Sequence, residues 1–457
     1  MIFSSLPFLF IFFPLIFFIY FISPYFIRNL VLVFGSLLFY FIGEPNYFFL
    51  IIFSIFFNYF ISLLIDRNKS KLILYLAIVI NILIIFYFKY YIFSLEILNT
   101  LGFKFDYNSE ISNIILPLGI SFFTFQIISY LIDIHTKKSV LIINPINFSL
   151  YISFFPQLIA GPIVRIHEIS KQLQRRIISF EDLFHGIERF IYGLSKKIII
   201  ANPLSVAVDQ IFSLPSSELS FSLCWVAAIL FALQIYYDFS GYSDMAIGLA
   251  RIFGFKFPEN FNYPYSSFSF QEFWRKWHMT LSSWFRDYLY IPLGGNRHGG
   301  FTTFRNLFIV FFLCGLWHGA SLNFILWGIY HGFFLCIERV VFVKEILLKY
   351  KKFSYLYFIF FMIVSWVIFR SNDINQLFIF FSNMFNPLNA NFLSVSEIIG
   401  NNVLFLAFIG CYFSLEISKK QLLKFNKYKI LFILILLLLS ICVMNISSYQ
   451  PFIYFRF

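Results

Sequence analysis

Long apolar runs alternate with short polar or Pro/Gly breaks along most of the chain. Five runs occupy residues 6–22, 29–42, 47–65, 72–93 and 114–134, and four more occupy 321–338, 356–370, 403–417 and 430–446. Segments such as Ser23-Pro24 and Gly43-Glu44-Pro45 separate them. Because a helix needs about 20 apolar residues to cross a bilayer, this pattern predicts an all-α, polytopic membrane protein.

The composition excludes a soluble domain. Of the 457 residues, 60% are hydrophobic and 12% are charged, about half the roughly 25% charged share of soluble proteins. This length and a mean hydropathy of +0.81 leave room for roughly ten to twelve membrane helices. The net charge of +12 therefore indicates loop orientation and contact with lipid headgroups, so we expect a lipid bilayer and no nucleic acid as partner.

The positive charges also predict an orientation. Basic clusters at 67–71, 135–138, 339–352 and 419–429 are expected to face the cytoplasm, which places both chain termini outside it. The first run has no basic segment before it and no cleavage site after it, so it is predicted to be a retained span. We expect one membrane domain over 1–457, with N-terminal helices at 1–134, a catalytic core at 135–340 and C-terminal helices with a FIYFRF tail at 341–457.

His318 is the candidate base in the core. The segment 316–323 interrupts two apolar runs, and Gly315 and Gly319 bracket the histidine. An ionisable side chain at membrane depth indicates a functional site, and irregular backbone there must be buried in protein or line a wet cavity. A desolvated imidazole stays neutral at pH 7 and accepts a proton from a hydroxyl. His331, on the following run, is expected to be a hydrogen-bonding residue of the core.

Three further polar residues stand in apolar surroundings. Residues 271–292 predict one amphipathic helix with an aromatic face, and His278 lies at the border of that face. From the residues alone, His278 is a structural histidine or part of the site. Asp238 and Asp244 lie in an apolar run and must face protein, where we expect them to connect helices as scaffold.

The absence of several catalytic motifs reduces the number of reaction types that the protein could catalyse. The sequence contains no HExxH, GxSxG or GxxxxGK[ST] motif, and its five cysteines are dispersed, so we expect buried thiols and no metal site. A histidine base without its own Ser or Cys nucleophile suits acyl transfer from a thioester to a hydroxyl. A transporter or polymer export channel, with the histidines and aspartates forming a proton path, is the alternative.

Three segments carry a family resemblance: QIYYDFSGYSDMAIGLARIFGF (234–255), FWRKWHMTLSSWFRDYLYIPLGG (273–295) and LWHGASLNFILWGIYHG (316–332). Together with PQLIAGPIVR (156–165) and the terminal FIYFRF, they resemble the membrane-bound O-acyltransferase family, in its alginate and peptidoglycan O-acetyltransferase branch. The resemblance implies a ring of helices around a central catalytic cavity. It also implies His318 as catalytic base and His278 as the second essential residue, with Trp317, Asn323, Arg286 and Asp287 as supporting residues.

The same resemblance implies further features of the reaction. Tyr454, in the tail, would be an acyl relay, although an interfacial aromatic anchor explains it equally. Acetyl-coenzyme A or an acyl carrier thioester would be the donor, with no bound cofactor. A periplasmic esterase-like protein would be the partner, an extracytoplasmic polysaccharide the acceptor, and the bacterial inner membrane the location. Transfer of D-alanine to teichoic acid is an alternative. Arg165, Arg175 and Arg176 could bind donor phosphates or only anchor a cytoplasmic face.

Overall fold

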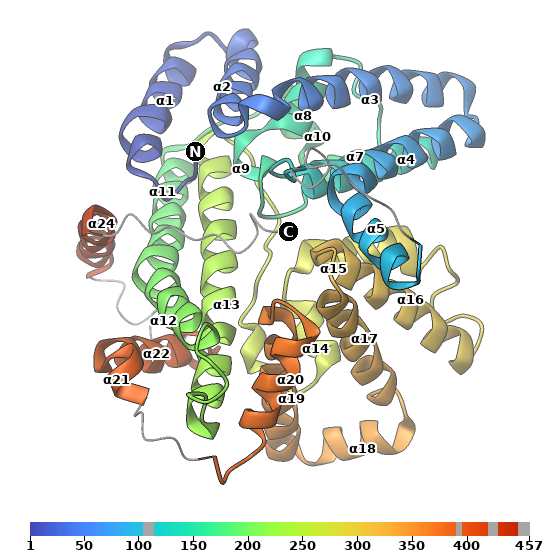
Figure 1. The fold of residues 1–457 in the computed structure, drawn as a ribbon. Helices are drawn as coiled ribbons and strands as arrows, with labels where there is room; N and C mark the ends of the chain where they lie inside the picture. Colours follow the sequence, from blue (N-terminus) through green and yellow to red (C-terminus); the bar gives the residue numbers. More distant parts are fainter. Residues whose placement is uncertain (104–113, 390–394, 419–427, 447–457) are drawn as a thin grey trace. The chain divides into compact units, whose positions relative to one another are not determined.

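The computed structural model describes residues 1–103, 114–389, 395–418 and 428–446, and these residues form helices and no strand (Figure 1). The α-helices are α1 (Phe13–Ile22), α2 (Arg28–Gly43), α3 (Phe48–Asn68), α4 (Lys71–Ile85), α5 (Tyr91–Thr100), α7 (Ile120–His135), α8 (Pro145–Ser153), α9 (Phe155–Leu158), α10 (Ile166–Gln174), α11 (Phe180–Ser195), α12 (Asn202–Phe212), α13 (Phe221–Ile252), α14 (Phe270–Lys276), α15 (Met279–Phe285), α16 (Gly300–His318), α17 (Leu322–Ile337), α18 (Val341–Lys349), α19 (Lys351–Arg370), α20 (Ile374–Met384), α21 (Val395–Ile399), α22 (Asn401–Phe413) and α24 (Lys429–Ile446). Four π-helical segments, at Phe8–Phe12, Phe86–Tyr90, Lys196–Ala201 and Arg286–Tyr290, lie beside or between them.

Several helices have the length and composition of membrane spans. Among the described residues, seven helical segments are long and apolar enough to cross a bilayer, and there are eight if α17 and α18, which meet at 83°, form one bent span. Three shorter apolar helices accompany them at Phe8–Ile22, Ile120–His135 and Asn401–Phe413. The polytopic, all-helical class predicted from the apolar runs is therefore confirmed.

Helix α13 is a candidate span that lies outside the nine long apolar runs of the sequence. It has 32 residues, and 72% of its most apolar window is buried within the protein. Aspartates and serines break its apolar pattern, yet Asp238, Ser240 and Asp244 are all buried. A helix enclosed by other helices can carry such polar residues because they bond to neighbours rather than face lipid.

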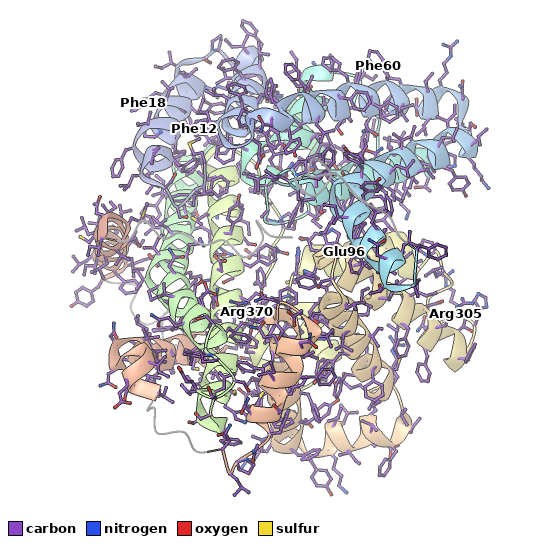
Figure 2. The ribbon with its side chains drawn as sticks, in the orientation of Figure 1. Phe12, Phe18, Phe60, Glu96, Arg305 and Arg370 are labelled. Carbon is purple, nitrogen blue, oxygen red and sulfur yellow. The ribbon has the colours of Figure 1, made fainter. Side chains whose placement is uncertain are left out.

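The described residues divide into two compact units, the first made of Met1–Phe190 and Tyr242–Pro258. In this unit α2 packs against α8, and α3 and α4 pack against α7. Phe12 of the first helical segment is buried, whereas Phe18 and Phe60 are 61% and 58% exposed and extend outward from their helices (Figure 2). Large apolar side chains exposed on apolar helices are typical of surfaces that face lipid.

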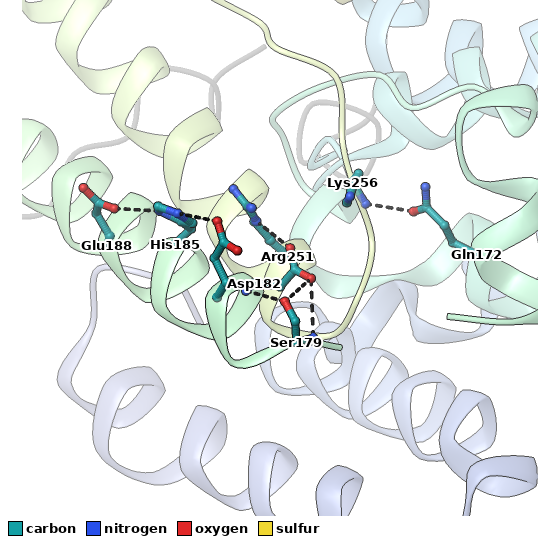
Figure 3. Close-up of polar contacts among 8 residues, drawn as sticks. Gln172, Ser179, Asp182, His185, Glu188, Arg251 and Lys256 are labelled. Carbon is teal, nitrogen blue, oxygen red and sulfur yellow. Dashed lines mark hydrogen bonds and ion pairs between the residues drawn. The ribbon is translucent and has the colours of Figure 1, made fainter. Parts of the chain in front are cut away.

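Polar contacts in the first unit tie the start of α11 to the end of α13. Ser179 and Asp182 bond to one another, and Arg251 Nε donates to Asp182 Oδ1 at 3.2 Å (Figure 3). Arg251 is half-exposed, so the ion pair contributes little by itself. Its geometry nevertheless fixes the C-terminal end of α13 against α11.

The second unit comprises Ile191–Gly241 and the described residues from Glu259 onward. Here α16 packs along α17, and α17 packs against α14 and α19. Among the cysteines of this unit, Cys224, Cys314 and Cys336 are buried, as predicted. The prediction was wrong for Cys411 and Cys442, which are exposed on the apolar helices α22 and α24. An apolar run does not distinguish a side chain inside the protein from one on its outer surface.

Helices α11 and α13 meet at paired glycines in the first unit, and this contact generates a prediction about stability. A Cβ atom on Gly248 would lie 2.6 Å from Gly186 O and 2.7 Å from Phe190 N, both backbone atoms. Gly248→Ala therefore forces the helices apart, and we expect a loss of about 1–3 kcal/mol in the free energy of unfolding. Thermal unfolding of the detergent-solubilised protein measures it. Gly300→Ala, where nothing lies within 4 Å of the added atom, is the control; equal melting temperatures would contradict the prediction.

Candidate active site

His318 is the last residue of α16, in a helical hairpin built on glycines. A Cβ atom on Gly315 would lie 2.3 Å from Phe324 O, and one on Gly328 would lie 2.2 Å from Phe311 O. Only glycine at both positions lets the α16 and α17 backbones approach this closely. The hairpin therefore sets the position of every ring near its closed end, including His318.

The turn after His318 is also crowded. Gly319 has an extended backbone, and a Cβ atom there would lie 2.2 Å from the ring of Phe324. The Gly319 N–H donates to the carbonyls of Gly315 and Leu316, which ends the helix. Close packing thus requires glycine at both positions that flank His318, and neither has a left-handed backbone.

Aromatic rings enclose the His318 imidazole. The side chain is 1% exposed, and its ring centroid lies 5.0 Å from that of Trp317, 4.9 Å from Trp327 and 5.4 Å from Phe369. Each of these rings stands nearly perpendicular to the imidazole or strongly inclined to it. The ring is therefore inside the protein and does not lie on the outer surface. The central catalytic cavity that the family resemblance implies stays a prediction.

His278 lies at a break in the amphipathic segment, so the single helix expected over 271–292 was wrong. Helix α14 ends at Lys276 and α15 begins at Met279, with His278 between them in a left-handed conformation (φ 39°, ψ 55°). A few per cent of non-glycine residues adopt this region, and histidine is enriched among them. The aromatic periodicity continued across the break, which is why the sequence pattern did not indicate it.

Asn260 determines the tautomer of His278, that is, which ring nitrogen carries the proton. Asn260 Oδ1 accepts hydrogen bonds from Thr280 N at 3.3 Å and Thr280 Oγ1 at 2.9 Å, which identifies this atom as the oxygen. It lies 3.1 Å from His278 Nδ1, so Nδ1 carries the proton and Nε2 presents a lone pair. His278 lies outside the candidate spans and is fully buried, and burial lowers its pKa to about 3. The imidazole is consequently neutral at pH 7.

Trp317 contacts both histidines. Its ring centroid lies 5.8 Å from His278 and 5.0 Å from His318, and it is 5% exposed. Phe239 of α13 covers His278 from another direction at 4.7 Å. The structure thus brings the two predicted histidines to one aromatic residue, although they lie 40 positions apart in the chain.

Asn323 and His331 lie on the same hairpin. Asn323 Nδ2 donates to Ser371 O at 2.7 Å and so ties the start of α17 to the end of α19, whose Phe369 touches His318. His331 is fully buried and accepts a hydrogen bond from Trp274 Nε1 through Nδ1 at 3.2 Å. The prediction that His331 is a hydrogen-bonding core residue is confirmed.

The two aspartates of α13 have basic partners, as a scaffold role requires. Asp238 Oδ1 lies 2.5 Å from Lys197 Nζ in the second unit, with both side chains under 5% exposed. Asp244, in the first unit, pairs with Arg189 at 2.7 Å. Each pair connects α13 to α11 or to the π-helical segment that follows it.

Arg286 and Asp287 occupy the π-helical segment after α15. Arg286 donates to both carboxylate oxygens of Asp287, at 2.7 and 3.1 Å, and its side chain is 62% exposed. Their supporting role stays a prediction. The adjacent pair forms without help from the histidines, so its presence does not by itself place it in the site.

The three candidate donor-binding arginines lie in the first unit and differ from one another. Arg176 donates to Tyr20, Asn29 and the Phe253 carbonyl and stacks on Phe255, so much of its guanidinium is used within the protein. Arg165 is buried at the start of α10, and Arg175 is exposed. Their donor-binding role stays a prediction, and Arg175 is the most accessible of the three.

The acyl relay at Tyr454 and the metal-binding capacity of the protein are the two other features considered from the sequence. Tyr454 lies outside the described residues, and its relay role stays a prediction. Among the residues that the structure describes, no group of three or more His, Cys, Asp or Glu could hold a metal ion. His318 and His278 instead lie inside an aromatic enclosure, and His278 is neutral at pH 7.

Sequence reasoning missed Asn260, Trp327 and the Trp274–His331 pair. Asn260 lies 18 positions before His278 in an irregular segment, and no local pattern links the two. Trp327 could have been found, since Asn323, Trp327 and His331 recur every four residues on α17 and so share one face.

The comparisons with known proteins decide the family. The model of the membrane-bound O-acyltransferase family matches residues 121–381, a stretch that includes both histidines. The chain belongs to the membrane-bound O-acyltransferase family. The resemblance inferred from its motifs is therefore confirmed, and the protein is a membrane O-acyltransferase.

Relatives of this O-acyltransferase cover most of its length. It is 35% identical to a probable alginate O-acetylase of Pseudomonas putida over 100% of both chains. It is 37% identical to a peptidoglycan O-acetyltransferase of Helicobacter pylori over 74% of this chain and 70% of that one. A teichoic acid D-alanyltransferase of Bacillus subtilis is 32% identical over 48% of this chain and 58% of its own.

The buried state of His278 generates a prediction about pH. Its pKa is about 3 in the folded protein and near 6.5 in an unfolded chain, so the unfolded state binds more protons between those values. Stability from this group is complete above pH 6.5 and falls as the pH drops toward 3. We expect His278→Gln to flatten the decline of melting temperature below pH 6.5. His298→Gln, at an exposed position, should keep the wild-type slope; equal slopes in all three proteins would contradict the prediction.

Proposed function

We propose that this protein moves an acetyl group from a thioester on the cytoplasmic side to hydroxyls of an extracytoplasmic polysaccharide. His318 acts as the general base that takes the hydroxyl proton, and His278 positions or polarises the reacting groups. Trp317 forms the wall between them, and Asn323 holds the hairpin against α19. The donor is acetyl-coenzyme A or an acyl carrier thioester, and the enzyme needs no bound cofactor or metal.

The burial of His318 among aromatic rings is the observation that carries this proposal. An imidazole that is 1% exposed is kept from bulk water, so the acyl group it handles is protected from hydrolysis. His278 is neutral and presents Nε2 rather than Nδ1, because Asn260 accepts from Nδ1. Two imidazoles beside one indole suit proton transfer from an alcohol, a general acid–base role.

The names of the relatives favour acetyl transfer. The alginate and peptidoglycan enzymes are named as O-acetylase and O-acetyltransferase, and 70–100% of their lengths align with this chain. The D-alanyltransferase aligns over 58% of its length, so D-alanyl transfer is the weaker candidate. Membership in an acyltransferase family also disfavours the transporter alternative.

The charges of the loops support a route across the membrane. The basic clusters favour a donor side in the cytoplasm and both termini outside it, in a bacterial inner membrane. Arg175, which is exposed, would contact the donor phosphates on the cytoplasmic side, and the buried Arg165 and Arg176 would add positive charge. On the outer side Tyr454 would hold the acetyl group as a phenyl ester before a periplasmic esterase-like partner delivers it to the polymer.

Replacement of His318 tests the base. We expect His318→Ala to lower acetyl transfer at least about 100-fold, since a general base contributes roughly 10²- to 10⁴-fold. Two assays measure acetyl transfer: the acetate released from the cell-surface polymer by alkali, and the label transferred from acetyl-coenzyme A in isolated membranes. The exposed His298→Ala is the matched control, and immunoblotting confirms equal amounts in the membrane. Undiminished transfer by His318→Ala would remove the assignment.

A separate experiment tests the relay. When labelled acetyl-coenzyme A is supplied without polymer or partner, we expect label on Tyr454, found by mass spectrometry of its peptide. A phenol, with a pKa near 10, is deprotonated far more easily by an imidazole than a sugar hydroxyl is. Tyr454→Phe should lose both the label and polymer acetylation, while His318→Ala should lose the label with Tyr454 intact. Normal polymer acetylation by Tyr454→Phe would exclude the relay.

A further inference from the structure

Two buried nitrogen atoms on α17 lack a hydrogen-bond acceptor. Trp327 and His331 are both 0% exposed, and within the described part of the chain Trp327 Nε1 and His331 Nε2 have no hydrogen-bond partner. Their rings are neighbours, with centroids 4.5 Å apart. Leaving a buried polar group without a partner is costly, so two such groups on adjacent rings indicate a place for a ligand atom.

The Trp274–His331 bond determines which nitrogen of His331 carries the proton. Trp274 Nε1 donates to His331 Nδ1, and an indole N–H has no acceptor capacity. Nδ1 must therefore be the unprotonated atom, and the proton of the neutral ring lies on Nε2. His331 Nε2 and Trp327 Nε1 are consequently both N–H donors, so the atom that satisfies them is an acceptor.

The two donors lie beside the candidate base. The Trp327 ring centroid is 4.9 Å from that of His318, and the rings are nearly perpendicular at 85°. Close packing at Gly315 and Gly328 holds the helix that carries the donors against the helix that carries the base. Trp327 therefore touches both His318 and His331, and the three rings form one contiguous group in the second unit.

We propose that Trp327 Nε1–H and His331 Nε2–H bind the carbonyl oxygen of the acyl thioester and hold the negative charge that develops on it. This inference rests on the proposed function and names its oxyanion-binding residues. Both donors are neutral, which suits a carbonyl oxygen that is uncharged on binding and becomes an oxyanion only during reaction. A phosphate would instead require arginine or lysine side chains.

The step balances with these groups. The hydroxyl proton passes to His318 while the hydroxyl oxygen forms a bond to the carbonyl carbon, and the π electrons of the C=O bond move to its oxygen. The two N–H groups donate to that oxygen. When the C=O bond re-forms, the carbon–sulfur bond breaks, and the thiolate takes the proton back from His318. The donors thus act on the tetrahedral intermediate and the base acts on the proton.

Turnover of the full-length protein in membranes tests the donors. Trp327→Phe removes the N–H and keeps an aromatic ring, and we expect kcat to fall about 100-fold with KM for acetyl-coenzyme A nearly unchanged, as for loss of one oxyanion donor. His331→Phe should also lower kcat. The matched control is Trp225→Phe, at an indole whose N–H donates to Met384 O. Wild-type kcat in both Trp327→Phe and His331→Phe would overturn the proposal.

A binding measurement separates this inference from the proposed function, because it needs no turnover. Acetyl-coenzyme A labelled with ¹³C at the carbonyl is bound to the His318→Ala protein, and its C=O stretch is recorded by infrared difference spectroscopy. We expect the C=O stretch of the bound thioester to have a lower frequency than in water-free solvent. In the double variant that carries both His318→Ala and Trp327→Phe, the frequency should return toward the value in solvent. A frequency that Trp327→Phe does not change would overturn the N–H assignment. If only the proposed function is wrong, the protein acetylates no polymer, but the shift of the C=O frequency is still observed.

Discussion

Helices α16 and α17 approach so closely at Gly315 and Gly328 that a Cβ atom at either position would lie within 2.3 Å of a carbonyl oxygen on the other helix. In lipid, apolar side chains gain little by leaving one apolar surrounding for another, so helices associate through such close packing. This contact determines the separation of His318 from Trp327. It also leaves the faces beside the glycines free for aromatic rings, which enclose the histidine.

The polar groups of the site are aromatic and imidazole rings, whereas buried polar groups elsewhere in the second unit include ion pairs. Charged side chains there form close pairs, as in the buried Lys197–Asp238 and the partly buried Arg370–Asp209, each with a nitrogen–oxygen distance of 2.5 Å. In the site, hydrogen-bond partners select the tautomers of two imidazoles: Asn260 for His278 and Trp274 for His331. Fixed neutral dipoles cost less to bury than charges, and they act strongly on a charge that forms among them.

Much of the fold was predictable because its signal is local. Apolar runs indicated the class, but the nine long runs include neither α16 nor α13, whose buried aspartates and serines break the hydrophobic pattern that marks a span. His318 was predicted to be functional because a histidine between two apolar runs is costly at membrane depth. The break at His278 and its partner Asn260 were not found, because a left-handed residue and a contact across 18 positions leave no periodic signal.

Spacing on α17 connects these observations. Asn323, Trp327 and His331 recur every four residues, so they form a row about 12 Å long at 1.5 Å per residue. Asn323 uses its amide nitrogen to hold Ser371, which leaves an acceptor oxygen at the start of the row. The other two positions present N–H groups. In the proposed reaction a carbonyl oxygen would bind at the Trp327–His331 end, where Trp327 also meets His318, so the polarity of the row would direct the reacting carbon toward the base.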